Sequence, residues 1–183
     1  MIPELGNFSL MLALALSLGL AIFPVLGVRS QNMVFMRTGA SLALGVFLFM
    51  LGSFFCLLHA FVNDDFTVTY VANNSNTALP LPYKISAIWG AHEGSLILWI
   101  LAMNAWLIGF IFLTKCKNTY FLNTVFSISC QVMFAFTLFT LLTSNPFERI
   151  LPIPPLNGAD LNPSLQDIAF TIHPPLLYFG YSG

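Results

Sequence analysis

The sequence has 183 residues, of which 57% are hydrophobic and only 7% charged, with a mean hydropathy of +0.84 and a formal net charge of −1. A soluble domain has about 25% charged residues, so this composition excludes a water-soluble globular protein, and the high apolar content excludes a disordered chain. With no basic run, the sequence also offers no surface for nucleic acid. The chain is therefore predicted to be a membrane protein.

Long runs without charge divide the chain into membrane-length segments. No Asp, Glu, Lys or Arg occurs in the ranges 5–28, 38–63, 94–114 and 118–147. Each run exceeds the roughly 20 residues with which a helix crosses a bilayer while satisfying its own backbone hydrogen bonds. We therefore predict one all-α polytopic membrane domain over residues 1–183. Its transmembrane helices are expected near 7–28, 38–62, 86–113 and 120–144, with the start of a truncated fifth at Pro174.

The orientation in the membrane is predicted from the positions of the cations. The two short connections carry most of them, namely Arg29, Arg37, Lys115 and Lys117. The segments 1–6, 63–85 and 145–173 hold only Lys84 and Arg149, beside most of the acidic residues. Because cytoplasmic loops are enriched in Lys and Arg, we predict an extracytoplasmic N-terminus and an extracytoplasmic loop 145–173.

The cysteines give no sign of a disulfide framework or of covalent heme attachment. The sequence has three cysteines and no C-x-x-C-H motif, so the chain is not itself a c-type cytochrome. Cys56 and His59 lie three residues apart on one predicted helix face, a spacing that suits a ligand pair. We favour the simpler interpretation, in which Cys56 is a small apolar residue near a helix end.

A polar block stands where the third predicted span begins, at the membrane boundary. It contains Trp89, His92, Glu93, Gly94 and Ser95. An ionisable pair at such a boundary suggests function, because its burial is costly. The alternative is that Trp89 is an interfacial residue, His92 and Glu93 are hydrated, and Gly90 and Gly94 permit close helix packing. On a helix, one stripe would carry His92, Leu96, Trp99, Met103 and Trp106, with Trp89 beyond its outer end.

The loop 145–173 is rich in proline and has no helical pattern, and loops of this length are often functional. Its apolar residues, among them Leu151, Ile153 and Leu156, predict a packed lid on the membrane face.

His173 is the last residue of this loop. Proline favours the first turn of a helix, so Pro174 and Pro175 predict a helix start with His173 at or near the N-cap. A helix N-terminus disfavours imidazolium, which would leave His173 a nitrogen lone pair for a metal or heme iron. The alternative is a solvated capping residue.

Five sequence blocks are distinctive in this order: MIPELG at 1–6, AHEGS at 91–95, NPFER at 145–149, DLNPSLQD at 160–167 and HPPLLY at 173–178. They resemble the amino-terminal part of the cytochrome c maturation protein F family, and the similarity covers essentially the whole chain. The resemblance implies a multi-pass protein of the bacterial or mitochondrial inner membrane that acts in cytochrome c-type biogenesis. Such proteins resemble heme lyases, which accept heme from a heme chaperone and assist its attachment to apocytochrome c.

The resemblance also implies roles for particular residues. His173 matches the first of two outer-face histidines that ligate the heme iron, with Pro174 and Pro175 positioning it. The family's tryptophan-rich segment, second outer histidine and ligands of a b-type heme are expected beyond Gly183. We therefore expect this chain to be an amino-terminal piece that is inactive alone. Its expected partners are the heme chaperone, thiol-redox and apocytochrome-handling subunits, apocytochrome c, the carboxy-terminal remainder and membrane lipid.

Charge pairing suggests one further role, because heme propionates seek cations and the outer side holds only Arg149 and Lys84. Both are candidate propionate partners. Two other function classes remain open. One is a proton- or quinone-linked membrane subunit that uses His92 and Glu93, and the other is a structural scaffold of an assembly complex.

Overall fold

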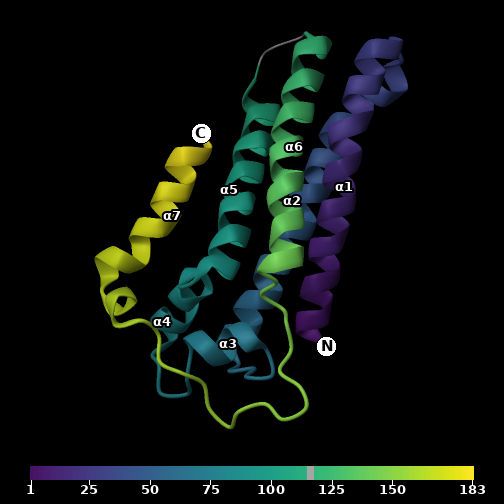
Figure 1. The fold of residues 1–183 in the computed structure, drawn as a ribbon. Coiled ribbons are helices and arrows are strands. Elements are labelled where there is room, and N and C mark those ends of the chain that lie inside the picture. The colour runs from purple at the N-terminus through teal and green to yellow at the C-terminus, as the bar shows by residue number, and fades with distance from the viewer. Residues whose placement is uncertain (115–117) are drawn as a thin grey trace.

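The computed structural model describes residues 1–114 and 118–183, and four long helices dominate them (Figure 1). These helices are α1 (Ile2–Ser30), α2 (Met33–Val62), α5 (His92–Leu113) and α6 (Thr119–Thr143). All four are long and apolar enough to cross a membrane. Across the described ranges the chain forms helices and no sheet, with one isolated β-bridge between Val68 and Arg149. The predicted all-α class with four membrane-length helices is confirmed.

The two ends of the bundle differ in charge. The N-terminus, the segment 63–91 and the loop 144–167 all lie at one end, at the bottom of Figure 1, which we call the N-terminal end. Every acidic residue of the sequence falls in or beside these segments, whereas Arg29 and Arg37 flank the opposite connection. Lys115 and Lys117, on which the orientation prediction also rests, lie outside the described residues. The extracytoplasmic N-terminus therefore stays a prediction.

Helices α1 and α2 form a tight antiparallel hairpin. Only Gln31 and Asn32 separate them: Gln31 adopts a left-handed conformation with φ 52°, and the Asn32 side chain accepts a hydrogen bond from the Val34 amide at 2.9 Å. Asparagine is a favoured N-cap because it satisfies such an orphan amide. The hairpin packs on α6 through α1 and on α5 through α2.

The bundle interior is held by close helix contacts and shared polar groups. A cluster of buried side chains toward the opposite end includes Leu20, Val46 and Phe126. The buried Ser127 hydroxyl donates a 2.5 Å hydrogen bond to the Ala21 carbonyl, which links α6 to α1. Such bonds and small interface residues hold transmembrane helices together, because lipid provides no hydrophobic drive between them.

The segment 63–91, which we call the cap, folds across the N-terminal end. It contains α3 (Thr69–Asn74), α4 (Leu81–Ser86) and the short 3-10 helix η1 (Ala87–Trp89). The third long helix was expected from residue 86 but begins at His92, because the backbone is extended at Ala91 and η1 folds back against the first turn of α5. The charge-free run, which begins at residue 94, lies closer to the observed start of α5 than the expected residue 86 does.

The last helix, α7 (Ile168–Ser182), corrects the predicted helix start at Pro174. The side chain of Asp167 caps it by accepting hydrogen bonds from the amides of Ala169 and Phe170 at 2.8 and 3.4 Å. Asp is a preferred N-cap, so the helix begins six residues earlier than the prolines suggested. Helix α7 runs along α5 at the edge of the bundle (Figure 1) and has no buried residue. Its 15 residues extend about 22 Å, short of a full crossing.

The loop 144–167 is anchored at its two ends and exposed in the middle. Phe147 and Leu161 are buried, and the short 3-10 helix η2 (Pro163–Gln166) leads into α7. The exposed fractions of Leu151, Ile153 and Leu156 are 83%, 81% and 102%, so these residues do not pack against the described part of the protein, and a lid on the membrane face stays a prediction.

Candidate functional site

His173 lies in the second turn of α7, not at its N-cap. Its side chain is exposed, and the described part of the chain offers its ring no hydrogen bond or ion pair. The influence of a helix N-terminus fades beyond the first turn, so the expected effect of the helix dipole on the His173 ring is wrong. What remains is an accessible imidazole at the N-terminal end of the bundle.

Pro174 and Pro175 lie inside α7 immediately after this histidine. Two contacts hold the turn that precedes them. The Thr171 hydroxyl donates a 2.9 Å hydrogen bond to the Leu165 carbonyl, and the indole Nε1 of Trp89 donates to the Thr171 carbonyl at 2.9 Å. The structure thus brings Trp89 of the polar block and the first half of α7 into direct contact, although they are distant in sequence.

The polar block builds the junction between the cap and α5. A Cβ atom added to Gly94 would lie 1.6 Å from the Ile88 carbonyl oxygen, so only glycine fits there. The Ser95 hydroxyl donates to the Trp89 carbonyl at 3.0 Å. Gly94 and Ser95 therefore fix η1 against α5, and with it the point from which the indole of Trp89 reaches α7.

Tyr70 of α3, which sequence reasoning did not single out, completes this junction. Its buried hydroxyl donates to the Ile88 carbonyl at 2.8 Å and accepts from the Ala91 amide at 3.2 Å. Burial raises the pKa of the Tyr70 phenol, which keeps the hydroxyl protonated as the donor that the carbonyl requires. An isolated tyrosine in a short polar segment gave no signal of this role.

His92 and Glu93 lie at the first turn of α5. The His92 Nδ1 atom is 3.4 Å from the Glu93 Oε2 atom, which is buried and has no hydrogen-bond partner among the described residues. The His92 ring is mostly exposed and lines a cavity of about 310 Å³. The other residues of the cavity wall are Ser95, Leu96, Trp99 and Tyr178.

The predicted stripe on α5 is the surface on which α7 packs. The rings of Trp99 and Tyr178 stack with centroids 6.1 Å apart. Farther along, the Trp106 indole donates to the Phe179 carbonyl at 2.8 Å. All three tryptophans of the sequence therefore contact α7, two through hydrogen bonds to its backbone and one through its ring.

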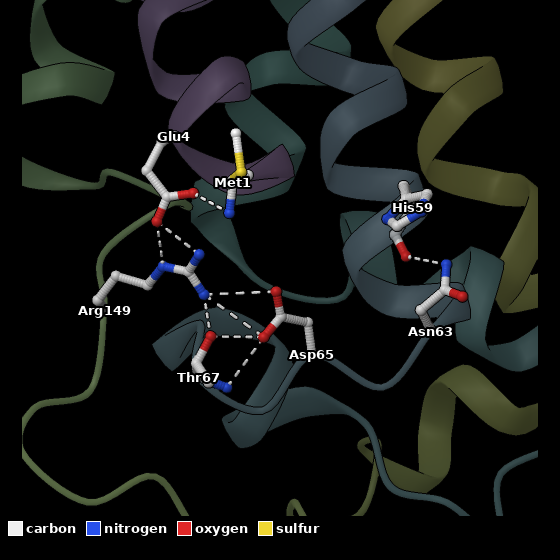
Figure 2. Close-up of polar contacts among 7 residues, drawn as sticks. All are labelled: Met1, Glu4, His59, Asn63, Asp65, Thr67 and Arg149. Carbon is white, nitrogen blue, oxygen red and sulfur yellow. Dashed lines mark hydrogen bonds and ion pairs between the residues drawn. The ribbon is translucent and has the colours of Figure 1, made fainter.

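Arg149 is held by carboxylates at a separate corner of the N-terminal end (Figure 2). Its guanidinium donates to Glu4 at 2.6 and 2.9 Å, lies 3.4 Å from Asp65 and bonds the Thr67 hydroxyl. The β-bridge between Val68 and Arg149 runs through the same corner. These contacts join α1, the cap and the loop 144–167.

Lys84 is buried in the cap, where its ammonium pairs with Asp64 at 2.5 and 2.7 Å. Both predicted propionate partners, Lys84 and Arg149, thus already have carboxylate partners. A heme propionate would have to displace Asp64 in one case, or Glu4 and Asp65 in the other.

The spacing of Cys56 and His59 on α2 creates no site in the structure. His59 is exposed, Cys56 is half-buried, and Figure 2 shows the His59 carbonyl accepting a 2.8 Å hydrogen bond from the Asn63 side chain. Residues 1–114 and 118–183 contain no group of three or more His, Cys, Asp or Glu side chains that could hold a metal ion.

Comparison with known proteins places these features in a wider context. The family model described as "Cytochrome C assembly protein" matches residues 89–183, which include Trp89, Gly94, Ser95 and all of α7. The chain is 45% identical over 183 residues to the cytochrome c-type biogenesis protein CcmF of Pseudomonas aeruginosa and 46% identical to that of Escherichia coli. It is 41% identical to the cytochrome c-type biogenesis protein NrfE of Haemophilus influenzae.

One solved structure, described as "Cytochrome c Heme Lyase CcmF", matches with a TM-score of 0.85 and 26% sequence identity. The match covers 100% of this chain and 28% of that one. The curated relatives behave likewise: the chain is covered completely and spans 28% of the length of the Pseudomonas aeruginosa and Escherichia coli proteins.

Proposed function

This chain belongs to the cytochrome c assembly protein family, and from that premise we propose that it handles heme in cytochrome c-type biogenesis. Heme is the substrate in this proposal, and His173 supplies one axial ligand to its iron. The observation that carries the proposal is the state of His173, an exposed imidazole with no protein partner in the described ranges, two residues after the Thr171 carbonyl that Trp89 of the cap bonds.

The residues present fit part of such a site. A neutral imidazole is a standard axial ligand of heme iron, and His173 stands on a helix surface that a flat macrocycle can approach. The cavity beside His92 and Tyr178 does not include His173 in its wall. We therefore assign to this chain one ligand only, and none of its described residues to a second, b-type heme.

We further propose a heme chaperone as the donor of heme and apocytochrome c as its acceptor. Relatives named for cytochrome c-type biogenesis and for heme lyase support a role in this process. Thiol-redox subunits and the sequence that the longer relatives possess would complete the machinery. We propose that the protein lies in the inner membrane, where this chain presents His173 as a ligand to the heme iron.

The test is replacement of His173 by Gly in the protein as the cell makes it, in its native membrane. The exposed His59 on α2 serves as the matched control through His59→Gly. We expect heme copurifying with the protein and the yield of c-type cytochrome to fall at least about tenfold for His173→Gly alone. Added imidazole should restore heme binding, because it can occupy the vacated position.

Unchanged heme content in His173→Gly would contradict the proposal. So would an equal loss in the His59→Gly control, or a loss that imidazole does not reverse while the protein remains folded. The imidazole arm matters because a collapse of α7 would also lower heme content but would not respond to a free ligand.

A second candidate function rests on the Glu93 carboxylate oxygen, which is buried and lacks a hydrogen bond among the described residues. With His92 at 3.4 Å it could accept a proton at the membrane surface. The charge-free interior of α5 offers no carboxylate or amine to continue a relay. If the relay operates, Glu93→Gln will alter the pH profile of cytochrome c maturation.

A further inference from the structure

We infer that Trp89 is a positioning residue for His173, which it controls through the backbone of α7. The inference rests on the proposed role of His173. The supporting observation is the hydrogen bond from the Trp89 indole to the Thr171 carbonyl, which Pro175 leaves without its usual partner in the helix.

Proline removes a backbone hydrogen-bond donor from the interior of α7. In an α-helix the amide of residue i donates to the carbonyl of residue i−4, and proline has no amide hydrogen. Pro175 therefore cannot donate to the Thr171 carbonyl, and the carbonyl remains an unpaired acceptor within its own helix. A buried or half-buried carbonyl without a partner is unfavourable, and a helix bends readily at such a point.

The indole Nε1 of Trp89 lies 2.9 Å from the Thr171 carbonyl oxygen and takes the place of the missing amide. Two side-chain hydroxyl groups hold the backbone that carries this indole. Ser95 donates a hydrogen bond to the Trp89 carbonyl, and Tyr70 donates one to the preceding Ile88 carbonyl. The donor is therefore fixed to the junction of the cap and α5, which lies outside α7.

Few hydrogen bonds attach α7 to the rest of the described protein. In the described residues, two hydrogen bonds join α7 to α5 and the cap, one from Trp89 to Thr171 and one from Trp106 to Phe179. The Asp167 cap and the contact from Thr171 to Leu165 stay within the loop and α7, and Leu165 packs against the buried cluster at this end of the bundle. Trp89 thus provides the one hydrogen bond among the described residues that ties the half of α7 carrying His173 to the cap.

The consequence is that the position of the His173 ring depends on one indole N–H group. Without it the helix can pivot at Pro174 and Pro175 while the Trp106 bond holds the far end. An imidazole displaced by about 1 Å ligates iron poorly, so the effect would appear in the ligation of heme and not in the stability of the bundle.

The experiment compares Trp89→Phe with Trp99→Phe in the complete protein purified from its native membrane. Trp99 is the matched control because its indole nitrogen is buried but has no hydrogen-bond partner in the described ranges. We expect Trp89→Phe to weaken heme retention about tenfold and to change the axial-ligand signature in the optical and electron paramagnetic resonance spectra. Trp99→Phe should retain the parental spectrum.

A suppressor provides the sharpest test. The change Pro175→Ala returns an amide to residue 175, which can donate to the Thr171 carbonyl from within α7. In the double variant Trp89→Phe/Pro175→Ala we therefore expect the parental spectrum and heme retention to return. This arm also guards against a folding defect, because restoring a helix amide would not repair a cap that lacks its indole.

The outcomes separate this inference from the proposed function. If His173→Gly binds heme normally, the proposed function fails, and the role of Trp89 fails with it. If His173→Gly loses heme while Trp89→Phe matches Trp99→Phe, only the role of Trp89 is overturned. Failure of Pro175→Ala to restore the spectrum of folded Trp89→Phe protein would also overturn it.

Discussion

The cap and α7 lie side by side at the N-terminal end, and they are held in opposite ways. The cap places Tyr70, Val71, Ala87 and Ile88 in the protein interior, whereas α7 buries no residue and is attached at a few points along α5. Regions with few buried contacts open at lower free energy than a packed core. The residue proposed to bind iron thus stands on the more weakly attached element, and a rigid neighbour determines its position.

This contrast predicts that substitutions in the cap change the stability of the whole fold, whereas changes at the α7 contacts affect ligation alone. Gly94→Ala and Tyr70→Phe alter the packing of the cap, whereas Trp89→Phe removes a contact of α7.

The largest effect is expected for Gly94→Ala. A Cβ atom there would lie 1.6 Å from the Ile88 carbonyl oxygen and 2.8 Å from the Tyr70 hydroxyl, so backbone must move. We expect a loss of about 3 kcal/mol or more in the free energy of unfolding, seen as loss of folded protein in membranes and detergent. Gly109→Ala is the control, because nothing lies within 4 Å of its added Cβ. Equal thermal stability of the two variants would remove the argument for a rigid cap.

A smaller effect is expected for Tyr70→Phe, which keeps the ring and removes the hydroxyl. The Ile88 carbonyl and the Ala91 amide lose their partner in a buried place, at a cost of about 1–3 kcal/mol. Tyr120→Phe, at an exposed site, should change stability little. Thermal denaturation of purified protein distinguishes the two, and similar melting temperatures would contradict the role given to Tyr70.

The same residue gives a pH dependence. Because burial raises the pKa of Tyr70 above the ordinary value, its contribution to stability is complete below about pH 10 and declines at higher pH, where the unfolded chain ionises first. The difference in stability between the parent and Tyr70→Phe should therefore narrow above about pH 10. A difference that stays constant across that range would indicate that the phenol is not buried as described.

The smallest effect is expected for Arg149→Gln. The guanidinium pairs with Glu4 and Asp65 at a corner that water reaches, so the loss should be at most about 1 kcal/mol and should shrink as salt increases. Arg29→Gln, at the opposite end of the bundle, is the comparison. A loss as large as that of Gly94→Ala would show that this ion-pair corner, and not the packed cap, governs the stability of the N-terminal end.

The long helices were predictable from the sequence because a long apolar run can cross a bilayer as a helix, which satisfies its own backbone hydrogen bonds. The start of α7 was predicted wrongly for a definite reason. The preference of proline for a first helical turn is a local rule, whereas Pro174 and Pro175 lie inside a helix whose free carbonyl is satisfied by Trp89, a residue on another element. Asp167 ahead of an apolar run was a usable signal for the true start.

The polar block was recognised, but the roles of its members were not. Sequence spacing placed Trp89, Trp99 and Trp106 on one stripe without showing what the stripe contacts. The fold-back at Ala91 and the close approach of Gly94 to Ile88 depend on tertiary packing, and no local pattern predicts them.

The short connection between α1 and α2 has a consequence for biosynthesis. Only Gln31 and Asn32 lie between the two helices, so α1 and α2 must lie next to each other in the bilayer. We therefore expect α1 and α2 to enter the bilayer together as one hairpin. The remaining helices are then expected to pack against this hairpin.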